Sequence, residues 1–201
     1  MTEIRTALLA GLQAMSAWEA AAVILAVIYL LLAIRQNAWC WPAALISAGI
    51  YLVLMFQSRL YMQSVLQVFY MGMAAYGWWH WRAGTADDGP LVVRSWSRSD
   101  HRWPLLVILL SGLTVGFLLA RYTDAAFPYL DALAACGAIV TTWMVARKVL
   151  QNWHYWFVID TVSVYLYASQ GLWLTALLFL VYLGLILVGY RQWRASMPAH
   201  A

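Results

Sequence analysis

The sequence predicts an all-helical (all-α) membrane protein with seven transmembrane helices, and three observations support this fold class. Of the 201 residues, 65% are hydrophobic and 10% are charged, whereas soluble domains have about 45–50% and about 25%. Seven stretches approach the roughly 20 apolar residues that a helix needs to cross a bilayer. The third and the seventh of these stretches share a sequence pattern. Together these features predict two similar groups of helices in a lipid bilayer.

Each expected span is an apolar run bounded by charged or helix-breaking residues. The junction at 35–37 reads RQN and the junction at 169–171 reads SQG, and neither is suited to continue an apolar helix in lipid. In chain order, the seven spans cover residues 18–34, 38–56, 60–81, 103–120, 127–146, 153–169 and 172–193.

The connectors and chain ends complete the predicted organisation. Residues 82–102 combine glycine, proline, aspartate and arginine, a composition typical of an exposed loop. Residues 1–17 hold Glu3 and Arg5 in a weakly apolar run, which predicts a short interfacial helix. The expected units are an N-terminal segment (1–17), a first three-helix bundle (18–82), a cytoplasmic loop (83–102), a linker helix with an outer loop (103–126), a second three-helix bundle (127–194) and a C-terminal tail (195–201).

The twelve Lys and Arg residues predict the orientation in the membrane. With the N-terminus outside, three of them lie on the outer side: Arg5, Arg59 and Arg121. The other nine lie on the inner side: Arg35, Arg82, Arg94, Arg98, Arg102, Arg147, Lys148, Arg191 and Arg194. Cytoplasmic loops carry the excess of basic residues, so we expect the N-terminus outside and the C-terminus in the cytoplasm. The basic residues are scattered at segment ends, so positive-inside topology explains them better than a nucleic-acid partner.

The sequence contains an internal repeat. Tyr70 matches Tyr182 and Trp81 matches Trp193, a constant offset of 112 residues that also relates Gly72 to Gly184, Gly77 to Gly189 and Leu60 to Leu172. Upstream, NAWCW at 37–41 echoes NWHYW at 152–156. Three spans, a lone span and three more spans place both triplets in the same orientation, with the fourth span as a linker. This 3+1+3 arrangement with parallel pseudo-repeats is SWEET-like, and such transporters bind their substrate between the halves.

Polar side chains within the sixth expected span predict a binding site. Trp153, Trp156 and Asp160 are spaced by three or four residues and therefore lie on one helix face; Asn152, Ser163 and Tyr167 extend the pattern. Two indole rings and a carboxylate can hold a flat cation, with about 0.5–2 kcal/mol from each ring. The alternative is that the tryptophans are interface anchors and that Asp160 belongs to a buried polar network.

The third expected span carries a second set of polar residues on one face. Gln63, Gln67 and Tyr70 could hydrogen-bond hydroxyl groups or a carboxamide, or the amides could bridge transmembrane helices. In the second copy of the repeat, Phe179 replaces Gln67 whereas Tyr182 keeps the tyrosine of position 70. The two halves therefore differ at a candidate ligand position, which suits an asymmetric substrate.

Enzyme motifs are missing from the sequence. It has no H-E-x-x-H, G-x-S-x-G or G-K-[ST] pattern, so we expect no catalytic residues, no ATP-driven transport by this chain alone and no cofactor. The histidines and the two cysteines lack metal-ligand spacing, so we expect no metal site, and we interpret Cys40 and Cys136 as small packing residues.

At these residues the chain resembles the PnuC family of vitamin transporters, which is best known for nicotinamide riboside. The resemblance rests on NWHYW followed by Asp160, on GLWLTALLFLVYLGLILVGYRQW at 171–193 and on the LQVFY…YGWWHW run of the third span. It covers about residues 31–194. The resemblance implies a SWEET-like fold, a homotrimer in the inner membrane, and binding elements at Asn152, Trp153, Trp156 and Asp160, with Gln63, Gln67 and Tyr70.

The same resemblance implies uptake of nicotinamide riboside by facilitated diffusion, with phosphorylation in the cytoplasm trapping the vitamin. Thiamine and riboflavin are alternative substrates within the family. A proton-coupled symporter with Asp160 as the proton carrier is a second hypothesis, and an intramembrane enzyme or a structural assembly factor is a third. A pH gradient that drives uptake, and that loses this effect in Asp160→Asn, would favour the symporter.

Overall fold

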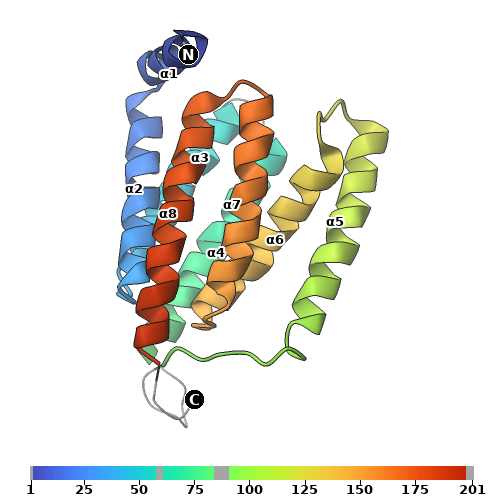
Figure 1. Ribbon diagram of the computed structural model, residues 1–201. Helices are drawn as coiled ribbons and strands as arrows, with labels where there is room; N and C mark the ends of the chain where they lie inside the picture. The colour runs from blue at the N-terminus through green and yellow to red at the C-terminus, as the bar shows by residue number, and fades with distance from the viewer. Residues whose placement is uncertain (1, 58–60, 84–90, 198–201) are drawn as a thin grey trace.

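The computed structural model of the chain describes residues 2–57, 61–83 and 91–197, and this part is helical, as expected (Figure 1). Leu60, residues 84–90 of the expected loop and residues 198–201 of the expected tail lie outside the described residues. In chain order the helices are α1 (Thr2–Ala14), α2 (Ala17–Ile34), α3 (Cys40–Gln57), α4 (Tyr61–Ala83), α5 (Arg102–Tyr122), α6 (Pro128–Ala146), α7 (Asn152–Ser169) and α8 (Trp173–Ala195).

Each of the seven expected spans corresponds to one helix, with ends that differ by a few residues. Five described helices are long and apolar enough to cross a membrane, namely α2, α3, α5, α6 and α8. Helices α4 and α7, with 23 and 18 residues, carry the polar side chains that the sequence singled out. The two most polar of these long helices therefore hold the candidate site residues.

The helices pack in two consecutive groups. Helix α3 packs against both α2 and α4, and α7 packs against both α6 and α8. The groups meet where α4 contacts α6 and where α2 contacts α8. Helix α5 lies to one side and packs against α6 (Figure 1). Gly112 and Gly116, the G-x-x-x-G of α5, allow this close approach, because a methyl group at Gly112 would lie 2.5 Å from Leu133 Cδ2.

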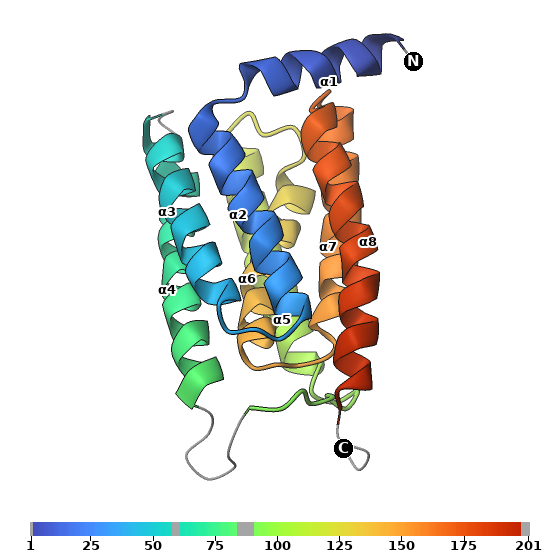
Figure 2. The ribbon, with the colours of Figure 1, turned by 90° about the vertical axis from the view of Figure 1, so that its left-hand side faces the viewer.

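Helix α1 lies across one end of the bundle (Figure 2), as expected for a helix along the membrane interface. A capping box begins the next helix, α2: the Glu19 amide donates to Ser16 Oγ at 3.1 Å, and the Ser16 amide donates to Glu19 Oε2 at 3.1 Å. This cap satisfies the first backbone amides of α2, so a new helix can begin there in a different direction from α1. Helix α1 packs against α8, and a methyl group on Gly11 would lie 3.5 Å from Leu174 Cδ2 near the start of α8.

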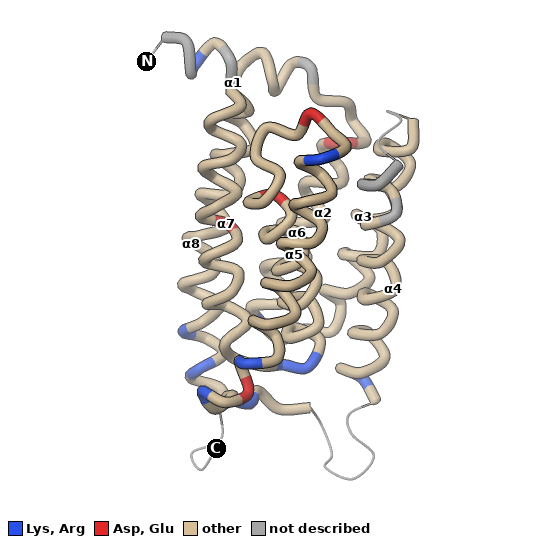
Figure 3. The backbone as a smooth tube through the Cα atoms, turned by 90° about the vertical axis from the view of Figure 1, so that its right-hand side faces the viewer, with Lys and Arg blue, Asp and Glu red and all other residues tan. Residues whose placement is uncertain are grey.

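Basic residues gather at the end of the bundle opposite α1 (Figure 3). Arg35 follows α2, Arg82 lies in the last turn of α4, Arg102 begins α5 and Arg147 follows α6. We call this the basic end. Exposed tryptophans, which favour membrane–water interfaces, occur near it and near the opposite end: Trp39, Trp79 and Trp103 in the first set and Trp18 in the second.

Candidate functional site

A cavity of about 180 Å³ lies between the two helix groups, near the middle of the bundle. Helices α2, α3 and α4 of the first group and α6 and α7 of the second line it. Its aromatic and larger polar side chains are Tyr29, Trp41, Gln67, Tyr70, Thr142 and Trp156. Three of the residues selected from the sequence, Gln67, Tyr70 and Trp156, thus meet at one place although they belong to different halves.

Several polar groups of the cavity wall are free to bind a ligand. The Ser47 hydroxyl donates to Ala22 O at 2.9 Å, and the Thr142 hydroxyl donates to Ala138 O at 2.7 Å, so both donors are already used. Within the described ranges, the Gln67 amide and the hydroxyls of Tyr70 and Tyr29 have no hydrogen-bond partner. The cavity therefore offers an amide and two phenols beside two indole rings.

Helix α7 turns the expected face inward, yet only Trp156 of that face lines the cavity. Asp160 and Ser163 are buried, whereas Val158 on the opposite face is exposed. Trp153 is 2% exposed and lies one turn closer to the basic end. Its ring meets Trp193 edge-on, with centroids 5.4 Å apart. In this structure the two tryptophans of the W-x-x-W motif have different surroundings.

Two other predicted residues, Asn152 and Asp160, are buried but do not line the cavity. Asn152 is fully buried and donates through Nδ2 to Val149 O at 2.6 Å, while its Oδ1 has no partner. Asp160 is 4% exposed, and its carboxylate has no hydrogen-bond partner among the described residues. It lies near enough to Tyr182 to interact with it electrostatically. Gln63 belongs to α4, but its side chain lies outside the described part of the structure.

Four buried tryptophans close the space between the cavity and the basic end. We call Trp41, Trp81, Trp193 and Trp153 the tryptophan layer. The rings follow one another in this order with centroid distances of 5.4, 6.2 and 5.4 Å. The Trp81 indole donates to Ala146 O at 3.0 Å, and the Trp193 indole donates to Ala33 O at 2.9 Å. Within the tryptophan layer, each half therefore donates one indole hydrogen bond to the other half.

The layer corrects the alignment of the two upstream motifs. Placing NAWCW over NWHYW pairs Trp41 with Trp156, but the structure pairs Trp41 with Trp153 at the offset of 112. A methyl group on Gly77 would lie 2.5 Å from Trp41 Cδ2, and one on Gly189 would lie 2.6 Å from Trp153 Cζ2. The alignment of NAWCW with NWHYW was wrong because Asn37 and Asn152, the first residues of the two motifs, occupy different positions in their turns.

The turns below the layer are also related by the offset of 112. Gln36 and Lys148 both have a left-handed backbone, with φ of 54° and 50°, which closes helices α2 and α6. Lys148 donates to Leu91 O at 3.0 Å and to Gln36 Oε1 at 3.4 Å, and its Nζ lies 4.8 Å from the Trp81 ring centroid. Burial lowers the pKa of the Lys148 ammonium. These contacts join both halves at the basic end.

The cavity is asymmetric because the halves differ around it. At the offset of 112, Ala44, Ala48 and Gln67 of the wall correspond to Trp156, Asp160 and Phe179. Phe179 stacks on Tyr167 with centroids 5.3 Å apart. Larger side chains therefore fill the equivalent space in the second half. Tyr29 was not singled out from the sequence, because a lone tyrosine in an apolar span carries no further signal.

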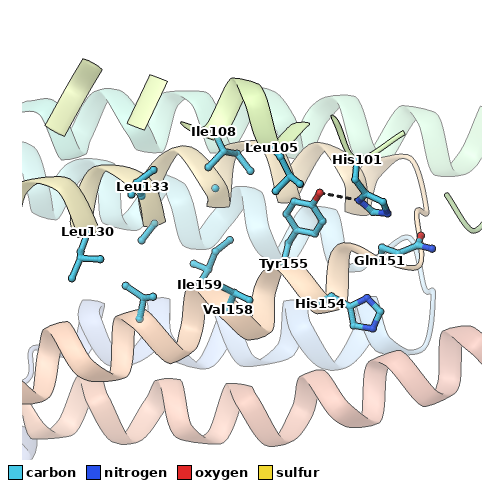
Figure 4. Close-up of a pocket in the computed structure, with 13 residues that line it drawn as sticks. His101, Leu105, Ile108, Leu130, Leu133, Gln151, His154, Tyr155, Val158 and Ile159 are labelled. Carbon is cyan, nitrogen blue, oxygen red and sulfur yellow. Dashed lines mark hydrogen bonds between the residues drawn. The ribbon is translucent and has the colours of Figure 1, made fainter. Parts of the chain in front are cut away.

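Two other features of the structure are not part of the candidate site. A larger cavity of about 520 Å³ lies between α5, α6 and α7 (Figure 4), but its wall is mostly apolar and includes none of the predicted residues. No group of three or more His, Cys, Asp or Glu residues in the described ranges is arranged to hold a metal ion.

Comparisons with known proteins agree with the fold and identify similar transporters. Residues 16–195 match the family described as nicotinamide mononucleotide transporter. The riboflavin/roseoflavin transporter RibM of Streptomyces davaonensis is 30% identical over 173 residues, which cover 85% of this chain and 81% of that protein. The nicotinamide riboside transporter PnuC of Escherichia coli is 24% identical over 174 residues, 74% of this chain and 73% of its own length.

A solved structure has the same fold. The crystal structure of the vitamin B3 transporter PnuC aligns with a TM-score of 0.72 at 16% identity, and the alignment covers 100% of this chain and 90% of that one.

Proposed function

Because the chain belongs to the nicotinamide mononucleotide transporter family, whose members are membrane transporters and not enzymes, we propose that it carries nicotinamide riboside across the membrane by facilitated diffusion. The observation that carries this proposal is the cavity between the halves, where Gln67, Tyr70 and Trp156 meet. A site between two parallel repeats is where such carriers bind their substrates.

The chemistry and the size of the cavity support nicotinamide riboside. Trp156 and Trp41 would stack on the pyridinium ring, while Gln67, Tyr70 and Tyr29 would hydrogen-bond the carboxamide and the ribose hydroxyls. About 180 Å³ is less than the roughly 300–1,000 Å³ of typical ligand sites, which favours a compact substrate. Asp160, which is buried but does not line the cavity, would supply the opposite charge, and Asn152, Trp153 and Gln63 would complete the site as the bundles move.

Riboflavin is the second candidate, because the relative with 30% identity carries that vitamin. Its three fused rings and ribityl chain need more space than the present cavity offers, so riboflavin transport would require a wider state. Thiamine, also an aromatic cation, fits the same chemistry but has no support from the named relatives.

Transport would proceed by opening the tryptophan layer. In the proposed orientation, seven spans in a 3+1+3 order place the basic end in the cytoplasm, so the present structure is closed toward that side. Release would require Trp81 and Trp193 to leave Ala146 O and Ala33 O while the two bundles rock apart. Cytoplasmic phosphorylation would then trap the vitamin. We propose a homotrimer for the assembled carrier, as in the resemblance to PnuC.

A titration of the purified protein with nicotinamide riboside, thiamine and riboflavin tests the substrate. We expect nicotinamide riboside to bind most tightly, and Gln67→Phe, which copies the second half, to weaken it at least tenfold, because a site built to hydrogen-bond its ligand discriminates strongly. Tighter binding of riboflavin would make riboflavin the substrate, and binding of none of the three would reject the proposal.

A further inference from the structure

Helix α5 forms a wedge with α7 that the transport cavity does not use. From its midpoint toward the end away from the basic end, α5 lies close to α6, because Gly112 faces Leu133 and Gly116 faces Tyr129. At the basic end, a hydrogen bond of 2.9 Å joins His101 Nδ1, just before α5, to the Tyr155 hydroxyl of α7. Within the described residues the two helices do not otherwise pack against each other, whereas α6 packs against both.

The wedge holds a cavity of about 520 Å³, nearly three times the 180 Å³ of the transport cavity, and the two share no lining residue. Its walls are apolar side chains such as Leu105, Ile108 and Val158 (Figure 4). Leu105 is 55% exposed and Val158 is 62% exposed, so the cavity opens sideways, toward lipid, and is not sealed inside the protein.

Polar groups line this cavity only near the basic end, where Figure 4 places His101, Tyr155, Gln151 and His154. The Gln151 side chain is held in place: its Oε1 accepts from the Trp96 amide at 2.9 Å and its Nε2 donates to Ser95 Oγ at 2.6 Å. The cavity therefore has a long apolar part and a polar opening at the level of the membrane surface.

The charge around the opening is positive. Arg98 and Arg102 flank His101 and are exposed, and Arg147 follows α6 at the same end. The carboxylate in this segment, Asp100, accepts from the amide and the hydroxyl of Ser97, both at 2.8 Å, and these bonds lower its pKa. Asp100 thus has local partners, whereas Arg98 and Arg102 have no ion pair in the described part of the chain.

We infer that the wedge between α5 and α7 is a binding site for an anionic phospholipid of the leaflet next to the basic end. One acyl chain fills the apolar part, and the phosphate lies at the opening, beside His101, Arg98 and Arg102. Each basic side chain near an anionic surface strengthens its attraction roughly fivefold. The lipid supports α5, which connects the two bundles, on the side that faces α7, because α5 packs against α6 but not against α7.

Native mass spectrometry of the full chain with phosphatidylglycerol and phosphatidylcholine tests this inference. We expect one tightly held phosphatidylglycerol per chain and no equivalent phosphatidylcholine. Ile108→Trp fills the wedge and should abolish retention, whereas Leu110→Trp, exposed on another face of α5, should keep it. Arg98→Gln with Arg102→Gln should weaken phosphatidylglycerol binding roughly 30-fold, whereas Arg35→Gln with Arg82→Gln, on α2 and α4, should not.

Three results would overturn the inference. Equal retention of both lipids would show that the wedge binds an acyl chain but does not recognise the headgroup. Retention of phosphatidylglycerol by Ile108→Trp would place the lipid elsewhere. Crosslinking from Val158 to a second copy of the chain, with no lipid held, would show that the wedge is covered by protein. Since none of these readouts involves the vitamin, they stand apart from the test of transport.

Discussion

The packing of the tryptophan layer predicts opposite effects for two glycines on the same helix. Gly189 of α8 lies against Trp153, so an alanine there would place its Cβ 2.6 Å from Trp153 Cζ2. Trp153 is 2% exposed and is held edge-on against Trp193, so its ring has little room to move. Inserting a methyl group into a packed core costs about 1–3 kcal/mol.

The matched control is Gly184→Ala, five residues earlier in α8. A methyl group there has no neighbour within 4 Å, and alanine is favoured over glycine within a helix by about 0.5–1 kcal/mol. We therefore expect Gly184→Ala to be neutral or slightly stabilising and Gly189→Ala to be less stable than it by about 1–3 kcal/mol.

Thermal unfolding in detergent, followed with a thiol-reactive dye, measures this difference in a Cys136→Ser background. Cys40 is fully buried and reacts only when the fold opens, whereas Cys136 is partly buried. The first half offers the same pair again: Gly77→Ala meets Trp41 and Gly72→Ala meets nothing within 4 Å. If both variants of a pair unfolded at the same temperature as the unaltered chain, the packing described for that half would be incorrect.

Three further predictions concern the cavity and its closure. Trp156→Ala removes a stacking ring worth about 0.5–2 kcal/mol, so nicotinamide riboside should bind about tenfold more weakly by titration; unchanged affinity would remove Trp156 from the site. Trp81→Phe removes one hydrogen bond between the halves, a net loss of about 0.5–1.5 kcal/mol, and should speed the labelling of Cys40 several-fold without unfolding; an unchanged rate would argue against opening at this layer. Asp160→Asn should still carry nicotinamide riboside at a measurable rate when no pH gradient is present, and an imposed pH gradient should not change that rate. If a pH gradient drove accumulation in the unaltered chain but not in Asp160→Asn, the symporter would be supported instead.

Much of the helical architecture follows from hydrophobicity, because an apolar run in lipid must satisfy its backbone within a helix. The inward face of α7 was also predictable, since Trp153, Trp156 and Asp160 recur at helical spacing; Trp153 and Asp160 are buried, and Trp156 is partly buried. The different surroundings of Trp153 and Trp156 could not be predicted from the sequence. They depend on how closely α8 approaches α7 at Gly189, which is a property of the two packed helices.

The closure at the basic end was even less visible in the sequence. Trp81 and Trp193 donate to main-chain carbonyls of Ala146 and Ala33, and a carbonyl acceptor carries no residue-specific signal. The offset of 112 residues aligns Trp41 with Trp153. The similarity of NAWCW to NWHYW instead suggested an alignment shifted by three residues, which pairs Trp41 with Trp156.

The most direct test of the proposed carrier is the flux of labelled nicotinamide riboside into liposomes that contain the purified chain, without ATP or an ion gradient. We predict saturable entry that stops when the inner and outer concentrations are equal and that falls strongly in Gln67→Phe and Trp156→Ala. No entry above that of empty liposomes, or equal entry in both variants, would contradict the account.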